Sequence, residues 1–441
     1  MEQQLESVSN SVSVSAYWRL VRQNRNFRNL WLAQIVSEIG DWFYTLAIYN
    51  LLLQLTGRAS SVALALMVQV LPQTVMGPIA GVVNDRLSRK RVMITTDLAR
   101  AVVVLAMLLV RSSSTVWIIY PLLLIESSMW AFFEPARTAT IPNVTADEDL
   151  LVGNTLSSAT WSLNLVAGAS IGGIALAMLG RNALFILNAL SFLASAYFLS
   201  RMRFRERHAE AAAKIAASYR TAYLSVIDGM RYVRRDSRRL ATLLIKTGLA
   251  QMGVSWVLFT VMGQRVFPLH WPGVDAQRGG VLGMSILLGA RGVGAIVGPL
   301  FSARWAGSSQ SRLRLGVLFG FLAIAVGYGA LGSATALWQA CICVVFAHCG
   351  GSTVWVFSTT LLQLNTEDKF RGRVFSAELG LSMLTLASGA YLTGFAIDHG
   401  IAPRTVASAA GWFMLVPLCG WAAAMRLWNR EPSPIRSQPS A

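Results

Sequence analysis

Long apolar stretches alternate with short polar or basic segments along the whole chain. A helix needs about 20 apolar residues to cross a hydrocarbon core about 30 Å thick, and twelve stretches approach that length. They lie at 29–53, 60–84, 92–110, 114–133, 151–179, 182–200, 240–263, 277–303, 315–333, 336–361, 374–396 and 405–426. The pattern predicts an all-α membrane protein with twelve transmembrane helices.

The longest interval between predicted spans falls near the middle of the chain, which indicates two six-helix pseudo-repeats. We expect a cytosolic tail at 1–28, an N-terminal bundle at 29–200, a cytoplasmic central loop at 201–239, a C-terminal bundle at 240–426 and a second tail at 427–441. Within the central loop, apolar residues of Tyr219–Arg235 recur every three or four positions with arginines off that stripe. This spacing predicts a basic amphipathic helix on the inner leaflet.

Composition narrows the class of protein. Of the 441 residues, 54% are hydrophobic and 13% are charged, whereas a soluble domain carries about 25% charged residues. These values exclude a soluble enzyme, a disordered chain and a coiled coil. The four cysteines lie in apolar stretches, so we expect no disulfide framework.

The net charge of +17 is explained by topology rather than by nucleic acid. With both termini inside, the predicted cytoplasmic segments hold 29 of the 38 Lys and Arg residues, and the outer loops hold 6. Cytoplasmic loops are enriched in these residues, so we predict a protein of the bacterial inner membrane with both termini on the cytoplasmic side. The basic excess also favours contact with anionic lipids, and no nucleic-acid partner is expected.

The two halves of the sequence share a degenerate internal repeat. The second predicted span ends with Gly77 and Gly81, four residues apart, and the eighth ends with Gly294 and Gly298. Each pair precedes a basic turn, which fits the parallel repeats found in some transporters. The second copy has Ser302 in the place of an aspartate, so the two halves are predicted to differ in function.

The turn after the second span carries a recognisable motif, Gly81-Val-Val-Asn-Asp85-Arg86-Leu-Ser-Arg89-Lys90-Arg91. This motif, the signature loop, resembles the loop between helices 2 and 3 of the major facilitator superfamily. Other segments resemble the drug–proton antiporter branch that includes macrolide efflux proteins and enterobactin-type siderophore exporters. They are FRNLWLAQIVSEIGDWF (27–43), DLAR (97–100), FFEPARTATIP (132–142), DGMRYVRR (228–235) and RGRVFS (371–376).

The resemblance implies a major facilitator fold and a role for the signature loop in gating. It assigns Asp85, Arg86 and Arg89 to a latch that holds the two halves in the outward-facing state. Gly81 is expected to let helices approach closely. The alternative for the basic residues is that they only satisfy the topology rule.

Three acidic residues lie deep inside predicted spans, away from their ends, where a charge costs at least a few kcal/mol and marks a functional candidate. Glu38 and Asp41 are three positions apart in the first span, and Glu126 is near the middle of the fourth. The resemblance implies that helices 1, 4, 7 and 10 line a central cavity, so all three are candidates for proton or substrate binding. Alternatively, Glu38 or Asp41 pairs with a buried cation, for which Arg100 and Arg291 are available.

Other ionisable residues have weaker assignments. Asp97 and Arg100 are three apart, and a local ion pair that braces the signature loop is favoured over substrate contact. Glu378 is near the inner end of the eleventh span and is a further candidate for the latch. Lys246, near the inner end of the seventh span, is expected to snorkel to the interface.

The second half adds two more candidates. Arg291 lies deep in the eighth span, and an acidic first half facing this cation suits a zwitterionic or catecholate-type substrate. His348 is in the middle of the tenth span and is a candidate for proton coupling, although a packing role is favoured over it. Its neighbours Cys341 and Cys349 make a metal site conceivable, but no carboxylate accompanies them and we expect no metal.

The sequence as a whole favours a secondary transporter that exports an amphipathic small molecule, such as a drug, macrolide or siderophore, by proton antiport. No P-loop motif is present, so ATP is not the expected driver. The alternatives are a lysophospholipid flippase of the same fold, a non-transporting membrane sensor, and a membrane enzyme that no residue constellation supports. We expect protons and a small-molecule substrate as partners, no cofactor, no enzymatic activity and a monomer.

Overall fold

The computed structural model of the chain describes residues 14–146, 149–204, 206, 230–249, 253–307 and 309–428. The described segments fold into helices and contain no strand. The helices are α2 (Val14–Gln23), α3 (Arg25–Thr56), α4 (Ala59–Arg86), α5 (Arg89–Ala106), α6 (Ile119–Val144), α7 (Leu150–Ser200), α10 (Ser237–Leu249), α11 (Gly253–Arg265), α12 (Ala276–Ala306), α13 (Gln310–Ser333), α14 (Leu337–Asn365), α15 (Asp368–Asp398), α16 (Pro403–Phe413) and α17 (Leu415–Trp428).

The predicted twelve spans are confirmed once two features are taken into account. Ten segments of the described chain are long and apolar enough to cross a membrane. One of them, within α7, reverses direction at Gly180, whose φ of 77° suits glycine, and therefore supplies two spans. The twelfth span is α3, which at 32 residues is also long enough to cross a membrane but carries the charged residues Glu38 and Asp41. Apolar side chains such as Met178 and Val102 point outward, as expected for helices that face lipid.

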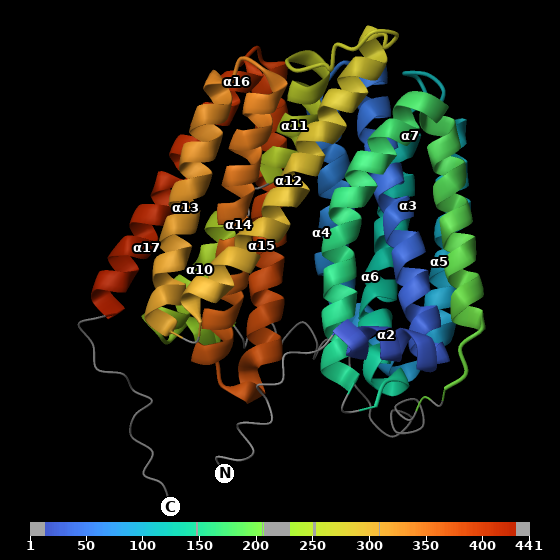
Figure 1. Cartoon of the computed structure of the whole chain (residues 1–441), viewed down its shortest axis with the longest axis vertical. Coiled ribbons are helices and arrows are strands. Elements are labelled where there is room, and N and C mark those ends of the chain that lie inside the picture. The colour runs from blue at the N-terminus through green and yellow to red at the C-terminus, as the bar shows by residue number, and fades with distance from the viewer. Residues whose placement is uncertain are drawn as a thin grey trace, which may run out of the picture.

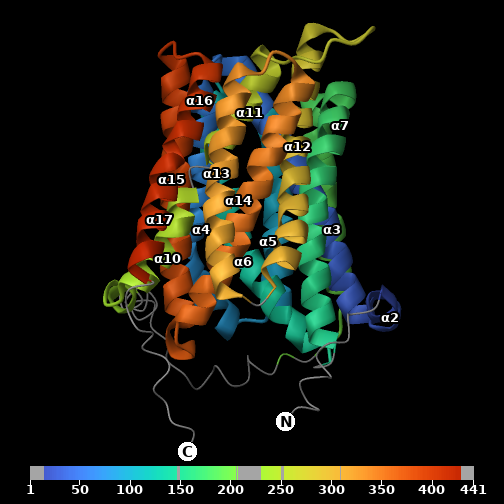
Figure 2. The same ribbon diagram turned by 60° about the vertical axis from the view of Figure 1, so that its left-hand side comes forward.

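The two sets of helices stand side by side (Figure 1). Helices α2–α7 form one half and α10–α17 the other, and Figure 2 shows the same bundle from the side of α13 and α16. The short helix α2 lies at the same end of the molecule as the last turn of α17 (Figure 1). We call this the α2 end, and the other end the far end.

The closest contacts between the two halves lie toward the far end. The carboxylate of Asp398, at the end of α15, accepts hydrogen bonds from the backbone N–H groups of Ala59 (2.7 Å) and Ser60 (2.9 Å) at the start of α4. Arg265 donates to the carbonyl oxygen of Gly57 at 2.7 Å. A Cβ atom at Gly394 would lie 2.7 Å from the Cα of Ser60. Glycine is therefore required there for α15 to approach α4.

Two elements differ from the sequence-based expectations. The fourth span was expected to end at residue 133, but α6 continues to Val144 and includes Pro135 and Pro142. The predicted N-terminal tail contains α2, whose Leu20 is buried in a cluster with Phe27. The predicted amphipathic helix Tyr219–Arg235 lies largely outside the described residues, which resume at residue 230.

Candidate functional site

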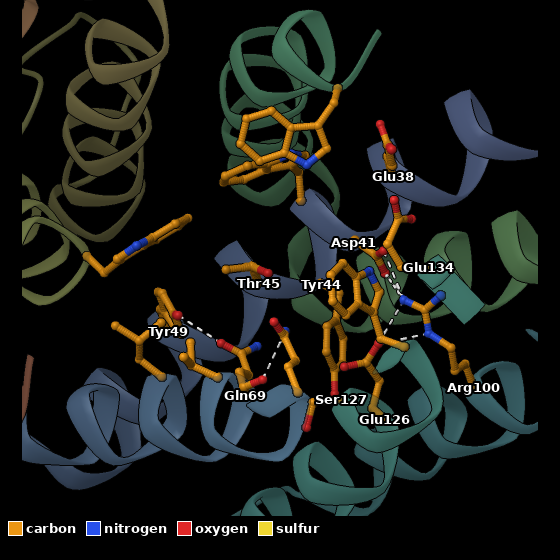
Figure 3. A pocket seen from close by; sticks show the side chains of 17 residues that line it. Glu38, Asp41, Tyr44, Thr45, Tyr49, Gln69, Arg100, Glu126, Ser127 and Glu134 are labelled. Atoms are coloured by element: carbon orange, nitrogen blue, oxygen red, sulfur yellow. Dashed lines mark hydrogen bonds and ion pairs between the residues drawn. The ribbon is translucent and has the colours of Figure 1, made fainter. Parts of the chain in front are cut away.

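A cavity of about 370 Å³ opens among helices of the N-terminal half. Four carboxylates and one arginine line it, and Trp256 of α11 is the residue from the other half (Figure 3). The aromatic lining residues are Trp42, Tyr44, Tyr49, Trp130, Trp161 and Trp256. The lining comes from α3, α4, α5, α6, α7 and α11, so the expectation that helices 1, 4, 7 and 10 line the cavity needs correction. Helix α14, the tenth span, supplies none of the residues that line it.

Arg100 of α5 joins two carboxylates from neighbouring helices. Its Nη2 lies 2.8 Å from Asp41 Oδ1 on α3 and 2.8 Å from Glu126 Oε1 on α6. Its Nε also donates to Glu126 at 2.9 Å (Figure 3). The guanidinium is buried over the ring of Phe192, 4.0 Å from its centroid. The sequence candidates Asp41, Glu126 and Arg100 therefore form one cluster.

Asp97 belongs to the same cluster at a longer distance. It lies one helical turn before Arg100, and its Oδ1 is 3.7 Å from Arg100 Nη1. The ion pair predicted between these two residues exists, but the closer partners of Arg100 come from α3 and α6. Three carboxylates thus surround one guanidinium, and the cluster carries an excess of negative charge unless protons are bound.

A second buried arginine, Arg137 of α6, organises the other side of the cavity. Its Nη1 donates to Gln34 Oε1 at 2.9 Å and to Ser157 Oγ at 2.7 Å, and its Nε donates to Glu134 at 2.9 Å. The sequence analysis missed Arg137 and Glu134 because it ended the fourth span before them. Their spacing of three within 132–142 was the available signal, since such spacing places two side chains on one face of a helix.

Glu38 lies on this second side. Its two oxygens accept hydrogen bonds from the amide groups of Gln34 and Asn164, both at 2.8 Å. Figure 3 shows it apart from Arg100, toward which Asp41 and Glu126 turn. Glu38 and Asp41 are neighbours in sequence but belong to different hydrogen-bond networks.

The candidates of the C-terminal half do not reach the cavity. Arg291 stacks on Trp256, 4.0 Å from the ring centroid, and Trp256 in turn stacks on Trp42 with centroids 5.6 Å apart. His348 is buried, with its Nε2 3.2 Å from the hydroxyl of Tyr328. Among the described residues, no three His, Cys, Asp or Glu side chains are grouped to hold a metal ion.

The signature loop is held within the N-terminal half. Arg86 ends α4, and Arg89 Nη1 donates to the carbonyl oxygen of Ala139 at 2.7 Å. The carboxylate of Glu206, a residue the sequence analysis did not single out, accepts from the backbone N–H groups of Arg89 (3.1 Å) and Lys90 (3.0 Å). The side chain of Asp85 lies outside the described part of the structure.

The two glycine pairs of the repeat behave differently. A Cβ atom at Gly81 would meet no described atom within 4 Å, so the close helix approach expected there is absent from this conformation. By contrast, a Cβ at Gly294 or Gly298 would collide with backbone carbonyl oxygens of α14. The glycines of the second copy are therefore required for packing of α12 on α14.

Glu378 and Lys246 form a separate buried pair. Lys246 Nζ lies 2.9 Å from Glu378 Oε2 and 4.4 Å from the ring centroid of Trp355. Both residues are in the C-terminal half, so the described ion pair of Glu378 is not with the signature loop. Lys246 is 5% exposed and does not snorkel to the interface, contrary to the sequence-based expectation.

Comparisons with known proteins support a transporter. The model of a family described as transmembrane secretion effector matches residues 16–439. Macrolide efflux protein A of Streptococcus pyogenes is 23% identical over 387 residues, which cover 87% of this chain and 90% of that protein. A putative bacilysin exporter of Bacillus subtilis is 23% identical over 319 residues (72% and 76%). The uncharacterised MFS-type transporter YfiS of Bacillus subtilis is 28% identical over 229 residues, about half the length of each protein.

Solved structures agree on the fold. The nucleoside transporter NupG superposes with a TM-score of 0.73 at 11% identity and covers 91% of this chain and 99% of its own. The peptide transporter PepTSo superposes with a TM-score of 0.69 at 8% identity, over 93% and 99% of the two chains. The chain is thus a multi-pass membrane protein of the transmembrane secretion effector family, within the efflux branch of the major facilitator superfamily.

Proposed function

We propose that this protein exports an amphipathic small molecule, such as a drug, macrolide or siderophore, in exchange for protons. The observation that carries this proposal is the cluster in which Asp41, Asp97 and Glu126 share Arg100. A charge in a low-dielectric interior is costly unless it is paired. One guanidinium cannot neutralise three carboxylates, so the cluster favours proton uptake whenever the cavity excludes water.

Proton binding would also change the helix contacts. Asp41 comes from α3 and Glu126 from α6, and the side chains of both are hydrogen-bonded to α5 through Arg100. Protonation of either carboxylate weakens its charge-assisted bond to the guanidinium. The relative positions of three helices then depend on proton occupancy, as an antiporter that alternates access requires.

The orientation in the membrane follows from the basic residues. Because Lys and Arg are concentrated in the predicted cytoplasmic segments, we assign the α2 end to the cytoplasmic side of a bacterial inner membrane. The contact of Asp398 with α4 then closes the outer side, which corresponds to an inward-facing state. Asp85, Arg86 and Arg89 remain our candidates for the latch of the outward-facing state.

Helix α2 carries two side chains that suit the surface of the membrane. Helix α2 exposes Trp18 next to Arg22, with the guanidinium carbon 5.4 Å from the ring centroid. An exposed tryptophan beside a cation suits the boundary between lipid headgroups and water, where anionic lipids attract the arginine. We propose that α2 lies on the inner leaflet and that the protein acts as a monomer.

The substrate class is supported by the cavity wall. Six aromatic side chains line a space of about 370 Å³, within the range of small-molecule sites. Among the similar proteins, one is named as a macrolide efflux protein and another as a putative bacilysin exporter. The test uses protein in sealed liposomes with a pH-sensitive dye inside, to which macrolides, catecholate siderophores and lysolipids are added one at a time under a pH gradient.

Asp41→Asn and Glu126→Gln are each expected to abolish substrate-dependent proton flux while the protein still folds and inserts. Each change removes a titratable carboxyl and keeps its size and a hydrogen-bonding group. Asp149→Asn, at the α2 end, is the matched control and should retain flux. Wild-type flux in both cavity variants would remove these carboxyls from proton coupling, and flux with lysolipids alone would favour a lipid flippase.

A further inference from the structure

Glu38 differs from the other three carboxylates of the cavity in what binds it. Asp41 and Glu126 are paired with Arg100, and Glu134 is paired with Arg137. Within the described residues, Glu38 makes no ion pair with a lysine or arginine, and it accepts hydrogen bonds from two neutral amides. Its carboxylate oxygens are therefore held by neutral donors, and Arg137 acts on its charge only through space, without a direct ion pair.

The orientation of Glu38 is fixed by a chain of hydrogen bonds that starts at Arg137. Gln34 Oε1 accepts from Arg137 Nη1 (2.9 Å) and from Ser157 Oγ (2.9 Å). An arginine cannot accept a hydrogen bond, so the oxygen of the Gln34 amide must face Arg137. The Nε2 of Gln34 must then face the other way, where it donates to Glu38 Oε1 and to the backbone carbonyl of Ser157.

The aromatic side chains complete a site for a cation. Trp42 and Trp161 line the same cavity as Glu38, and aromatic faces attract cations. A carboxylate held by neutral donors in a partly dry cavity attracts a ligand cation more strongly than one that already has an arginine partner. Arg291, a buried cation of the other half, stacks on Trp256 and is not among the residues that line the cavity.

We propose that Glu38 binds the protonated amine of a cationic amphipathic substrate, and that Arg137 is a positioning residue that orients Glu38 through Gln34. This inference rests on the proposed export function and divides the cavity into two parts. The Arg100 cluster handles protons, and the Glu38 side recognises the charge of the substrate. The second part can be tested by binding alone, without transport.

The test uses two fluorescent probes of the same shape, N-(3-dimethylaminopropyl)dansylamide and N-(4-methylpentyl)dansylamide. They differ in one position, where the first has a basic nitrogen and the second a CH group. Their dissociation constants are measured by dansyl fluorescence on the purified full chain in detergent at neutral pH. The wild type is expected to bind the amine more tightly than the neutral probe by about tenfold, which is the effect of about 1.4 kcal/mol.

The variants separate the roles of the residues. Glu38→Gln is expected to abolish the preference for the amine and to leave the affinity for the neutral probe within about twofold. Glu38→Asp should restore part of the preference. Arg137→Met, made together with Glu134→Gln so that the ion-pair partner of Arg137 is not left charged, should reduce the preference with little change in neutral-probe binding. Asp149→Asn removes one negative charge outside the cavity and should retain the full preference.

Two outcomes would overturn the inference. The first is a binding result: either Glu38→Gln prefers the amine probe as strongly as the wild type does, or the wild type binds both probes with equal affinity. The second is loss of proton flux in Glu38→Gln with the neutral probe as substrate, which would make Glu38 a proton site. If the variant that lacks Arg137 prefers the amine probe as strongly as the wild type does, the positioning role of Arg137 is wrong and the role of Glu38 stands. If the wild type shows the binding preference but no proton flux with either probe, the export proposal fails and the amine site stands.

Discussion

Arg100→Leu is expected to destabilise the protein severely and to abolish transport. The substitution leaves Asp41, Asp97 and Glu126 facing one another in a buried cluster without their cation. Removal of one partner from a buried ion pair typically costs about 3–5 kcal/mol, because the remaining charge is uncompensated. Arg100 is 1% exposed, so water cannot take over its role without a rearrangement of the helices. The measurement is the thermal unfolding midpoint in detergent.

The control for this prediction removes the charges that the lost cation leaves behind. Arg100→Leu combined with Asp41→Asn and Glu126→Gln should recover part of the thermal stability, because two of the three negative charges disappear with the positive one and Asp97 alone keeps its charge. Proton-coupled transport should remain absent, since no titratable carboxyl is left at those two positions. An unfolding midpoint of Arg100→Leu equal to that of the wild type would contradict the central place of this arginine.

Asp398→Ala is expected to shift the protein toward the outward-facing state. The carboxylate of Asp398 accepts two backbone N–H groups at the start of α4, in the other half of the molecule. A negative charge at a helix N-terminus pairs with unsatisfied donors and with the helix dipole, and such caps are worth about 0.5–2 kcal/mol. A loss of this size changes the ratio of two conformations by about 2–30-fold.

The shift can be measured as a distance between spin labels on the outer side. The four native cysteines are first replaced, and labels are attached to cysteines introduced at Ser113 and Ser333, both of which are exposed. Asp398→Ala should increase the population at the longer distance. Asp275→Ala is the matched control, because Asp275 caps α12 within its own half by accepting from the N–H of Arg278 (2.8 Å). Equal distance distributions for Asp398→Ala and the control would show that the cap does not hold the halves together.

The sequence predicted the spans more accurately than the site. Hydrocarbon thickness sets the length of a spanning helix, so twelve apolar stretches could be counted without knowledge of their packing. The end of α6 was misplaced because the apolar stretch used to define the span ends at residue 133, whereas α6 continues through Pro135 and Pro142 to Val144. This error removed Glu134 and Arg137 from the predicted site.

The sequence offered Arg100 and Arg291 as possible partners of Asp41 but could not choose between them, and the structure pairs Asp41 with Arg100. Spacing along one helix predicted that Asp97 pairs with Arg100, and the two are 3.7 Å apart. The closer partners, Asp41 and Glu126, come from other helices, and many placements of α3 and α6 are compatible with the same hydropathy pattern. For the same reason Glu38 and Asp41, three residues apart, could not be assigned to separate networks.

The sequence by itself determined the membrane class, the number of spans and the acidic character of the first half, because lipid imposes length and polarity on each helix separately. The tertiary structure decided which charges neutralise one another. It paired Asp41 and Glu126 with Arg100 and Glu134 with Arg137, whereas within the described residues Glu38 is hydrogen-bonded to two amides and has no ion pair. Ion pairing depends on a few ångströms of distance between helices, and that distance is set by packing across the whole bundle.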